Sequence, residues 1–240
     1  MHTPITSNTI AEPLAKVIAR IQEAAHTCGR NSETVRLIAV SKSQPASAVA
    51  MAYSCGQRDF GENYLQEALE KQIELGHLVD IQWHFIGPIQ SNKTRPIAEN
   101  FAWVHSIDRE KVAQRLNDQR PANLPRIQVC LQVNIDNEPT KSGVPLAALP
   151  ALAKAVSRLP RLQLRGLMAI PAAVDNAGQQ LAAFHKLRVA LEDLQAQGYA
   201  VDTLSMGMSG DLEAAIAEGA TLVRVGTDIF GARQALINQE

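Results

Sequence analysis

The amino-acid sequence predicts an α/β fold of the TIM-barrel class: one (β/α)8 barrel domain over residues 1–240, with an extra helix before the first strand. The length of 240 residues matches the usual size of one such barrel. Short apolar or β-branched segments alternate with helical patterns, which indicates parallel strands joined by helices. The alternative is an open doubly wound sheet, but no glycine-rich dinucleotide fingerprint follows the first predicted strand.

The first predicted element is a helix over residues 11–25. Leu14, Val17, Ile18 and Ile21 recur at intervals that place them along one face of an α-helix. Because this helix precedes the first strand, it is the extra element of the predicted barrel.

Eight segments are predicted strands because they are rich in apolar and β-branched residues, and most are bounded by turn residues. They are residues 36–40, 58–61, 81–87, 101–107, 127–134, 164–170, 201–207 and 221–226. Helical patterns lie between them at residues 46–54, 63–75, 146–159, 179–197 and 211–219. Pro150 fits the first turn of a helix, so the helix in its pattern is expected to begin there.

The composition argues against several classes of function. Because the net charge is −1, no field of one sign attracts nucleic acid or an anionic membrane. Aromatic residues make up only 4% of the chain, which argues against base-stacking platforms for single-stranded nucleic acid. No apolar stretch approaches the length of a membrane span, and the N-terminal segment has no apolar signal core. We therefore expect a cytoplasmic protein that binds neither nucleic acid nor membrane.

The spacing of cysteine and histidine predicts no metal site. Cys28, Cys55 and Cys130 are not at metal-ligand spacing, and the sequence favours three reduced thiols. His84 and His105 lie in neighbouring predicted strands, but no matching cluster of carboxylates or cysteines accompanies them. Such histidines more often satisfy local hydrogen bonds.

Lys42 is the first candidate functional residue. Active sites of (β/α)8 barrels form where the strands end, and Lys42 follows directly after the strand predicted at residues 36–40. Desolvation at such a position favours the neutral amine, which can attack an aldehyde or ketone and form an imine. The alternative is a lysine at the barrel rim that keeps its ammonium group in water.

Two loops after the last two predicted strands form a candidate anion site, because barrel enzymes frequently bind phosphate there. Ser209 lies in a glycine-rich segment before a predicted helix, where backbone N–H groups, the helix dipole and a hydroxyl can hold an anion. Gly226 and Thr227 offer groups for the same anion. Asp211 and Glu213 count against this site, since carboxylates in a first helical turn compete with a phosphate. Both loops could instead be ordinary strand-to-helix turns with capping residues.

Arg224 lies inside the last predicted strand and shares a face with Gly226. An unpaired charge inside a barrel is costly, so this guanidinium needs a partner. The partner is either a carboxylate such as Glu62 or Asp136, or a ring nitrogen or acidic group of a bound ligand.

Several segments together resemble one protein family. They are AVSKSQP around Lys42, FGENYLQEALEK from Phe60, HFIGPIQSNK from His84, VNIDNEPTKSG from Val133, LRGLMAIP from Leu164 and LSMGMSGDLEAAIAEGATLVRVGTDIFG from Leu204. In this order they span nearly the whole chain and resemble the YggS/PROSC family of pyridoxal phosphate homeostasis proteins. The combination is far more specific than any single segment.

The resemblance implies a barrel like the N-terminal domain of alanine racemase, with pyridoxal 5′-phosphate (PLP) held as a Schiff base on Lys42. It implies phosphate contacts from Ser209, Gly226 and Thr227, and it places Arg224 opposite the pyridine nitrogen. Further residues in family motifs near the cofactor are Asn63, His84, Met168 and Met206.

These implications favour a PLP-binding protein of intracellular PLP homeostasis, which stores, masks or delivers the cofactor, over an enzyme. A guanidinium at the pyridine nitrogen leaves that nitrogen unprotonated and weakens the cofactor as an electron sink. Racemisation also needs a second acid–base group, and Tyr64 is the only tyrosine near a predicted strand end.

The expected partners are PLP itself and the apo forms of PLP-dependent enzymes as recipients. The expected state is a monomer, because the chain lacks the second, dimer-building domain of similar racemases. Two alternatives stay open. One is a PLP-dependent amino-acid racemase with an unrecognised second base, and the other is a Schiff-base aldolase that acts on a phosphorylated sugar.

Overall fold

The strands of the protein close into a barrel. A computed structural model describes residues 8–138 and 140–231. Within them each strand pairs in parallel with the next, and the eighth pairs with the first. The strands are β1 (Arg36–Val40), β2 (Asp59–Glu62), β3 (Gln82–Phe85), β4 (Trp103–Ile107), β5 (Ile127–Gln132), β6 (Leu162–Met168), β7 (Thr203–Ser205) and β8 (Leu222–Val225). This closed order confirms the predicted (β/α)8 barrel and excludes the open doubly wound sheet.

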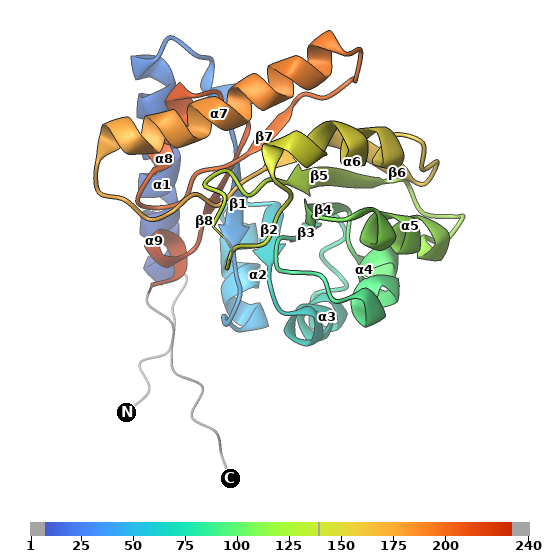
Figure 1. Ribbon diagram of the computed structural model, residues 1–240. Coiled ribbons are helices and arrows are strands. Elements are labelled where there is room, and N and C mark those ends of the chain that lie inside the picture. The colour runs from blue at the N-terminus through green and yellow to red at the C-terminus, as the bar shows by residue number, and fades with distance from the viewer. Residues whose placement is uncertain (1–7, 139, 232–240) are drawn as a thin grey trace.

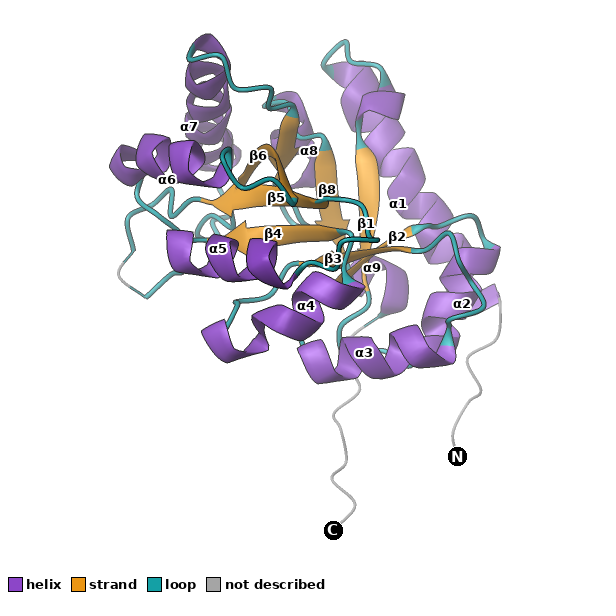
Figure 2. Ribbon diagram, turned by 90° about the vertical axis from the view of Figure 1, so that its right-hand side faces the viewer, coloured by secondary structure: helices purple, strands orange, loops and turns teal. Residues whose placement is uncertain are grey.

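Helices cover the outside of the barrel, as two ribbon views show (Figure 1, Figure 2). The α-helices are α1 (Asn8–Thr27), α2 (Ala46–Ser54), α3 (Leu65–Glu74), α4 (Thr94–Asn100), α5 (Glu110–Gln119), α6 (Leu149–Val156), α7 (Ala177–Ala196), α8 (Leu212–Ala217) and α9 (Thr227–Phe230). Short 3-10 helices are η1 (Ser32–Thr34), η2 (Ser91–Lys93) and η3 (Leu146–Ala148). Helix α1 precedes the barrel and packs against α8 and α9.

The extra N-terminal helix is present and extends beyond the predicted residues 11–25 at both ends. Val17 and Ile21 are buried, as their spacing predicts. Ile18 is 39% exposed, because it lies at the edge of the apolar stripe rather than at its centre.

The predicted and observed elements agree in type, and their ends differ by a few residues at most positions. Residues 36–40 and 46–54 form β1 and α2 with the predicted bounds. Pro150 lies in the first turn of α6, as expected. Helices α4, α5 and α9 are not among the elements predicted from the sequence. Helices α4 and α9 have seven and four residues, too short for a clear periodicity, whereas Val112 and Leu116 carry a helical signal in α5.

Two apolar layers stabilise the barrel. The larger layer fills the space between the strands and the helices. The smaller layer lies inside the barrel and contains Ile38, Trp103, Cys130, Met168 and Leu222. Along β8, Val223 and Val225 belong to the outer layer and Leu222 to the inner one. Because side chains alternate along a strand, Arg224 also points into the barrel.

No helix in residues 8–138 and 140–231 is both long and apolar enough to cross a membrane. In the same residues, no three His, Cys, Asp or Glu side chains come together in a way that could hold a metal ion.

Candidate functional site

A cavity of about 290 Å³ opens at the carboxyl ends of the strands. Its walls are formed by Val40, Lys42, Asn63, Ile86, Ile170, Met208, Ser209, Gly210, Arg224, Gly226 and Thr227. Arg224 lies inside β8, and the others end or follow β1, β2, β3, β6, β7 and β8. The barrel thereby brings together many of the residues predicted from the sequence, namely Lys42, Asn63, Ser209, Arg224, Gly226 and Thr227.

Three other predicted site residues, His84, Met168 and Met206, do not line this cavity. Met168 belongs to the apolar layer inside the barrel, and Met206 packs in the layer between strands and helices. His84 is fully buried within the barrel. All three side chains are buried near the strands whose ends form the cavity, and none of them is part of its wall.

Some residues in the cavity wall were missed by the sequence reasoning: Val40, Ile86, Ile170, Met208 and Gly210. Each of them ends or follows a strand, so the rule that located Lys42 also applies to them. These side chains carry no reactive or charged group that would single them out in the sequence.

Lys42 is half-buried, and hydrogen bonds hold the residues on either side of it. On one side, Ser41 Oγ donates a hydrogen bond of 2.6 Å to Glu62 Oε1. On the other side, the Ser43 backbone N–H donates a hydrogen bond of 2.6 Å to Glu67 Oε1. Ser43 also adopts a left-handed backbone conformation with φ 60°. The segment that carries Lys42 is therefore fixed at both ends.

A buried lysine joins these two hydrogen-bond acceptors. Lys71 Nζ lies 2.8 Å from Glu62 Oε1, also contacts Glu67 Oε1, and donates to the Ser41 carbonyl oxygen at 2.6 Å. The side chains of Lys71 and Glu62 are only 4% and 0% exposed. Burial raises the pKa of Glu62, and the nearby Lys71 opposes this shift. The ion pairs thus form a rigid support behind the Lys42 segment.

Gly226 allows β8 to end directly beside β1. A Cβ atom at this position would lie 3.0 Å from the Val40 carbonyl oxygen and 3.3 Å from Val40 Cβ. The absence of a side chain therefore lets the Gly226–Thr227 backbone form one wall of the cavity next to Lys42.

The loop after β7 is held by its own carboxylate. Asp211 Oδ1 accepts a hydrogen bond of 2.6 Å from the Met208 backbone N–H. Burial raises the pKa of Asp211, and the Met208 N–H and the charge of Arg224 oppose this shift. Asp211 thus holds the loop before α8 and does not cap the helix with its side chain, while Ser209 and Gly210 remain in the cavity wall.

Arg224 is buried inside the barrel and lines the cavity. Its Nη1 donates to Ser205 Oγ (2.7 Å) and its Nη2 to the Ala169 carbonyl oxygen (2.9 Å). The carboxylates considered from the sequence have other partners: Glu62 contacts Lys71, and Asp136 contacts Lys141. Desolvation lowers the pKa of Arg224 to about 10. The guanidinium is therefore still protonated at neutral pH.

A chain of hydrogen bonds continues from Arg224 through the barrel interior. His105 Nδ1 lies 2.8 Å from Ser205 Oγ, and His105 Nε2 lies 2.9 Å from His84 Nδ1. His84 Nε2 lies 2.9 Å from Asp59 Oδ1. Burial lowers the pKa of both histidines, that of His105 well below its usual value. Both rings are therefore neutral at physiological pH.

Asn63 lines the cavity and has an unsatisfied polar atom. Its side-chain oxygen Oδ1 is buried and has no hydrogen-bond partner. Gly87 packs so closely that a Cβ atom there would lie 2.3 Å from the Asn63 carbonyl oxygen, which fixes the backbone of Asn63. A buried acceptor without a partner is rare, and a bound molecule with a donor group would satisfy it.

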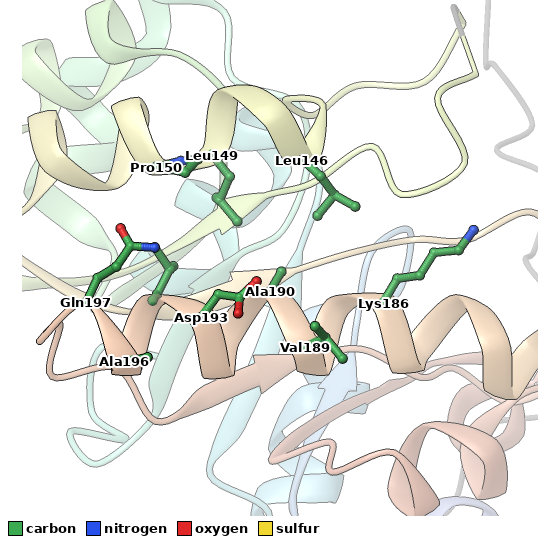
Figure 3. A pocket seen from close by; sticks show the side chains of 10 residues that line it. Leu146, Leu149, Pro150, Lys186, Val189, Ala190, Asp193, Ala196 and Gln197 are labelled. Carbon is green, nitrogen blue, oxygen red and sulfur yellow. The ribbon is translucent and has the colours of Figure 1, made fainter.

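A larger cavity of about 440 Å³ lies between α6 and α7 (Figure 3). Leu149 and Pro150 face it from α6, and Val189, Ala190 and Asp193 from α7. This groove between two outer helices is mostly apolar. It lacks the combination of a lysine, an arginine and backbone loops that marks the cavity at the strand ends.

The chain is similar in sequence to known proteins of one family. The alanine racemase N-terminal domain family matches residues 14–234. A pyridoxal phosphate homeostasis protein of Pseudomonas aeruginosa is 63% identical over 226 residues, which cover 94% of this chain and 96% of that protein. The chain belongs to the pyridoxal phosphate homeostasis protein family.

Another member of the pyridoxal phosphate homeostasis protein family, from Escherichia coli, is 54% identical over 229 residues, which cover 94% of this chain and 97% of that protein. These relatives confirm the resemblance that the sequence motifs indicate. The relatives match almost over their whole lengths, so the similarity includes all the strands and loops that form the cavity.

Solved structures share the fold of this family member. PipY of Synechococcus elongatus, in a structure with PLP bound, superposes with a TM-score of 0.83 at 42% identity and covers 92% of this chain. Alanine racemase of Corynebacterium glutamicum superposes with a TM-score of 0.67 at 17% identity. The match covers 93% of this chain but only 62% of the racemase, and at this identity it shows the barrel fold alone.

Proposed function

We propose that this protein binds PLP in the cavity at the strand ends and serves intracellular PLP homeostasis by storing, masking or delivering the cofactor. The observation that carries the proposal is the single cavity that joins Lys42, Arg224 and the two anion loops. The names of the relatives and the PLP-bound structure of PipY support the same assignment.

The residues present fit PLP. The cavity offers an amine from Lys42, a buried guanidinium from Arg224 and an unsatisfied acceptor at Asn63 Oδ1. Ser209 and Thr227 line the same cavity, and their backbone N–H and hydroxyl groups are of a kind that suits a phosphate. A compact aromatic aldehyde with a phosphate group needs this combination of groups.

Lys42 supplies the covalent link. Its neutral amine attacks the aldehyde carbon of PLP, and the loss of one water molecule leaves a carbon–nitrogen double bond, the Schiff base. The hydrogen bonds on Ser41 and Ser43 hold the backbone on both sides of this lysine. This link masks an aldehyde that would otherwise react with other amines in the cell.

Arg224 favours storage of the cofactor over its use in catalysis. PLP supplies an electron sink in enzymes when its pyridine nitrogen is protonated. A guanidinium has no acceptor atom, so Arg224 can only donate to that nitrogen and leaves it unprotonated. The hydrogen bonds to Ser205 and Ala169 fix the position of the guanidinium.

The tyrosines give the racemase alternative little support. Tyr64, the candidate second base, is 52% exposed and does not line the cavity. Tyr53 donates a hydrogen bond to Asp80, and Tyr199 packs against the outer apolar layer. All three tyrosines belong to the described residues, and none stands opposite Lys42 across the cavity.

An absorbance spectrum of the purified protein mixed with PLP tests the proposal. We expect a Schiff-base band that disappears on reduction with borohydride and that Lys42→Ala lacks. The same band in Lys42→Ala would disprove the role of Lys42. Turnover of an amino acid at about 1–1000 per second by the loaded protein would contradict the homeostasis function.

We further propose that the protein is a cytoplasmic monomer and that its recipients are apo forms of PLP-dependent enzymes. The partly open cavity at the barrel mouth gives the cofactor a direct route out. Recovery of activity in an apo enzyme mixed with the loaded protein, compared with the same concentration of free PLP, measures delivery. Sedimentation of the loaded protein measures the oligomeric state.

A further inference from the structure

Arg20 on α1 contacts both loops that are proposed to hold the phosphate of PLP. Its Nη2 donates to the Ser209 carbonyl oxygen (3.1 Å). Its Nε and Nη2 donate to the Glu213 carboxylate, at 3.1 and 2.9 Å from Oε1. Its Nη1 donates to Asp228 Oδ2 (2.8 Å). One guanidinium therefore bridges the segment after β7 and the segment after β8.

The packing of α1 places the Arg20 side chain beside the two loops. Helix α1 lies beside α8 and α9, as Figure 1 shows. Glu213 lies in the first turn of α8, and Asp228 lies in the first turn of α9, next to Thr227. The planar guanidinium presents several donors in fixed directions, so it can hold acceptors on two elements at once.

The two carboxylates are unfavourable neighbours for a phosphate. Glu213 and Asp228 each add a negative charge close to the residues that line the proposed phosphate site. Arg20 forms ion pairs with both of them and offsets this charge. The competition from Glu213 that the sequence suggests is thereby reduced.

The contact with Ser209 also sets the orientation of a backbone amide. In a trans peptide the carbonyl oxygen and the following N–H point in opposite directions. Because the Ser209 carbonyl oxygen points to Arg20, the Gly210 N–H points away from α1. Gly210 lies in the cavity wall, and in this orientation its N–H is directed away from α1 and does not bond to that helix.

We propose that Arg20 is a positioning residue for the phosphate group of PLP, acting through the two loops without touching the ligand. The proposal rests on the proposed function, because it assigns a role within the same site. It predicts that Arg20 matters for ligands with a phosphate and not for the aldehyde ring alone.

The test compares titrations with PLP and with pyridoxal, the same aldehyde without the phosphate, followed by the Schiff-base absorbance. We expect Arg20→Met to weaken PLP binding about tenfold, the scale of one charge-assisted hydrogen bond, and pyridoxal binding less than twofold. Lys16→Met is the matched control, because Lys16 is a cation on the same helix whose ion pair, within the described residues, is with Glu12. It should change neither affinity.

A second variant separates charge from geometry. If neutralisation of Glu213 is part of the role, Arg20→Met/Glu213→Gln should regain part of the lost PLP affinity, and Arg20→Lys should retain part of it. Equal losses for PLP and pyridoxal in Arg20→Met would overturn the proposal, as would no loss for either. If the wild-type protein binds neither PLP nor pyridoxal, the proposed function itself is refuted.

Discussion

Asp59 and Arg224, at the two ends of the interior chain, determine the direction of its hydrogen bonds. The ionised carboxylate of Asp59 only accepts, so neutral His84 donates to it from Nε2 and accepts at Nδ1 from His105 Nε2. His105 Nδ1 then accepts from Ser205 Oγ, which itself accepts from the Arg224 guanidinium. Each histidine is therefore neutral and limited to one tautomer.

The neutral state of His105 predicts a stability that falls in acid. Burial lowers the folded-state pKa of His105 well below its usual value. In mild acid, His105 is therefore protonated in the unfolded chain and stays neutral in the folded protein. The stability from this group is present above about pH 6.5 and is lost as the pH falls below it. We expect His105 alone to contribute a loss of up to about 2 kcal/mol between pH 7 and pH 5.

Urea unfolding at the two pH values measures this effect. His105→Asn should show a smaller loss of stability between pH 7 and pH 5 than the wild-type protein. His26→Asn is the matched control, because His26 lies at the exposed end of α1. An unchanged pH dependence in His105→Asn would contradict the neutral, buried role of this ring.

The N-terminal helix α1 can be predicted from the sequence, but its contacts with the loops after β7 and β8 cannot. The spacing of Val17 and Ile21 predicts the buried face. The contacts of Arg20 with Glu213 and Asp228 join residues about 200 positions apart, as their numbers show, so no local pattern can reveal them.

Burial of α1 can be tested with two isoleucines on the same helix. Ile21 is 5% exposed and Ile18 is 39% exposed. Ile21→Ala should lower the free energy of unfolding by about 2–5 kcal/mol, because it leaves a cavity in the outer apolar layer. Ile18→Ala should cost less than about 1 kcal/mol. Equal costs in urea unfolding would show that α1 does not pack as described.

At the scale of the whole molecule, the sequence predicts the barrel and the place of its site, while long-range contacts determine the details. Alternation of strands and helices is enough to predict the fold and to place Lys42 and Ser209 at strand ends. The pairing of Lys71 with Glu62 cannot be predicted in this way, because it depends on how α3 packs against β2. The inward direction of Arg224 follows from alternation, but its partners Ser205 and Ala169 do not.

The closed barrel predicts that PLP stabilises the protein as one unit. Lining residues come from strands on both sides of the β8–β1 junction, so a bound ligand links the two ends of the sheet. At a free ligand concentration of 100 times Kd the stabilisation is about 2.7 kcal/mol. For a chain of this size that should raise Tm by about 5–10 °C. A thermal melt should show one transition that shifts as a whole with PLP, and Lys42→Ala should show a much smaller shift. Two transitions of which only one moves would show that part of the chain unfolds independently of the site.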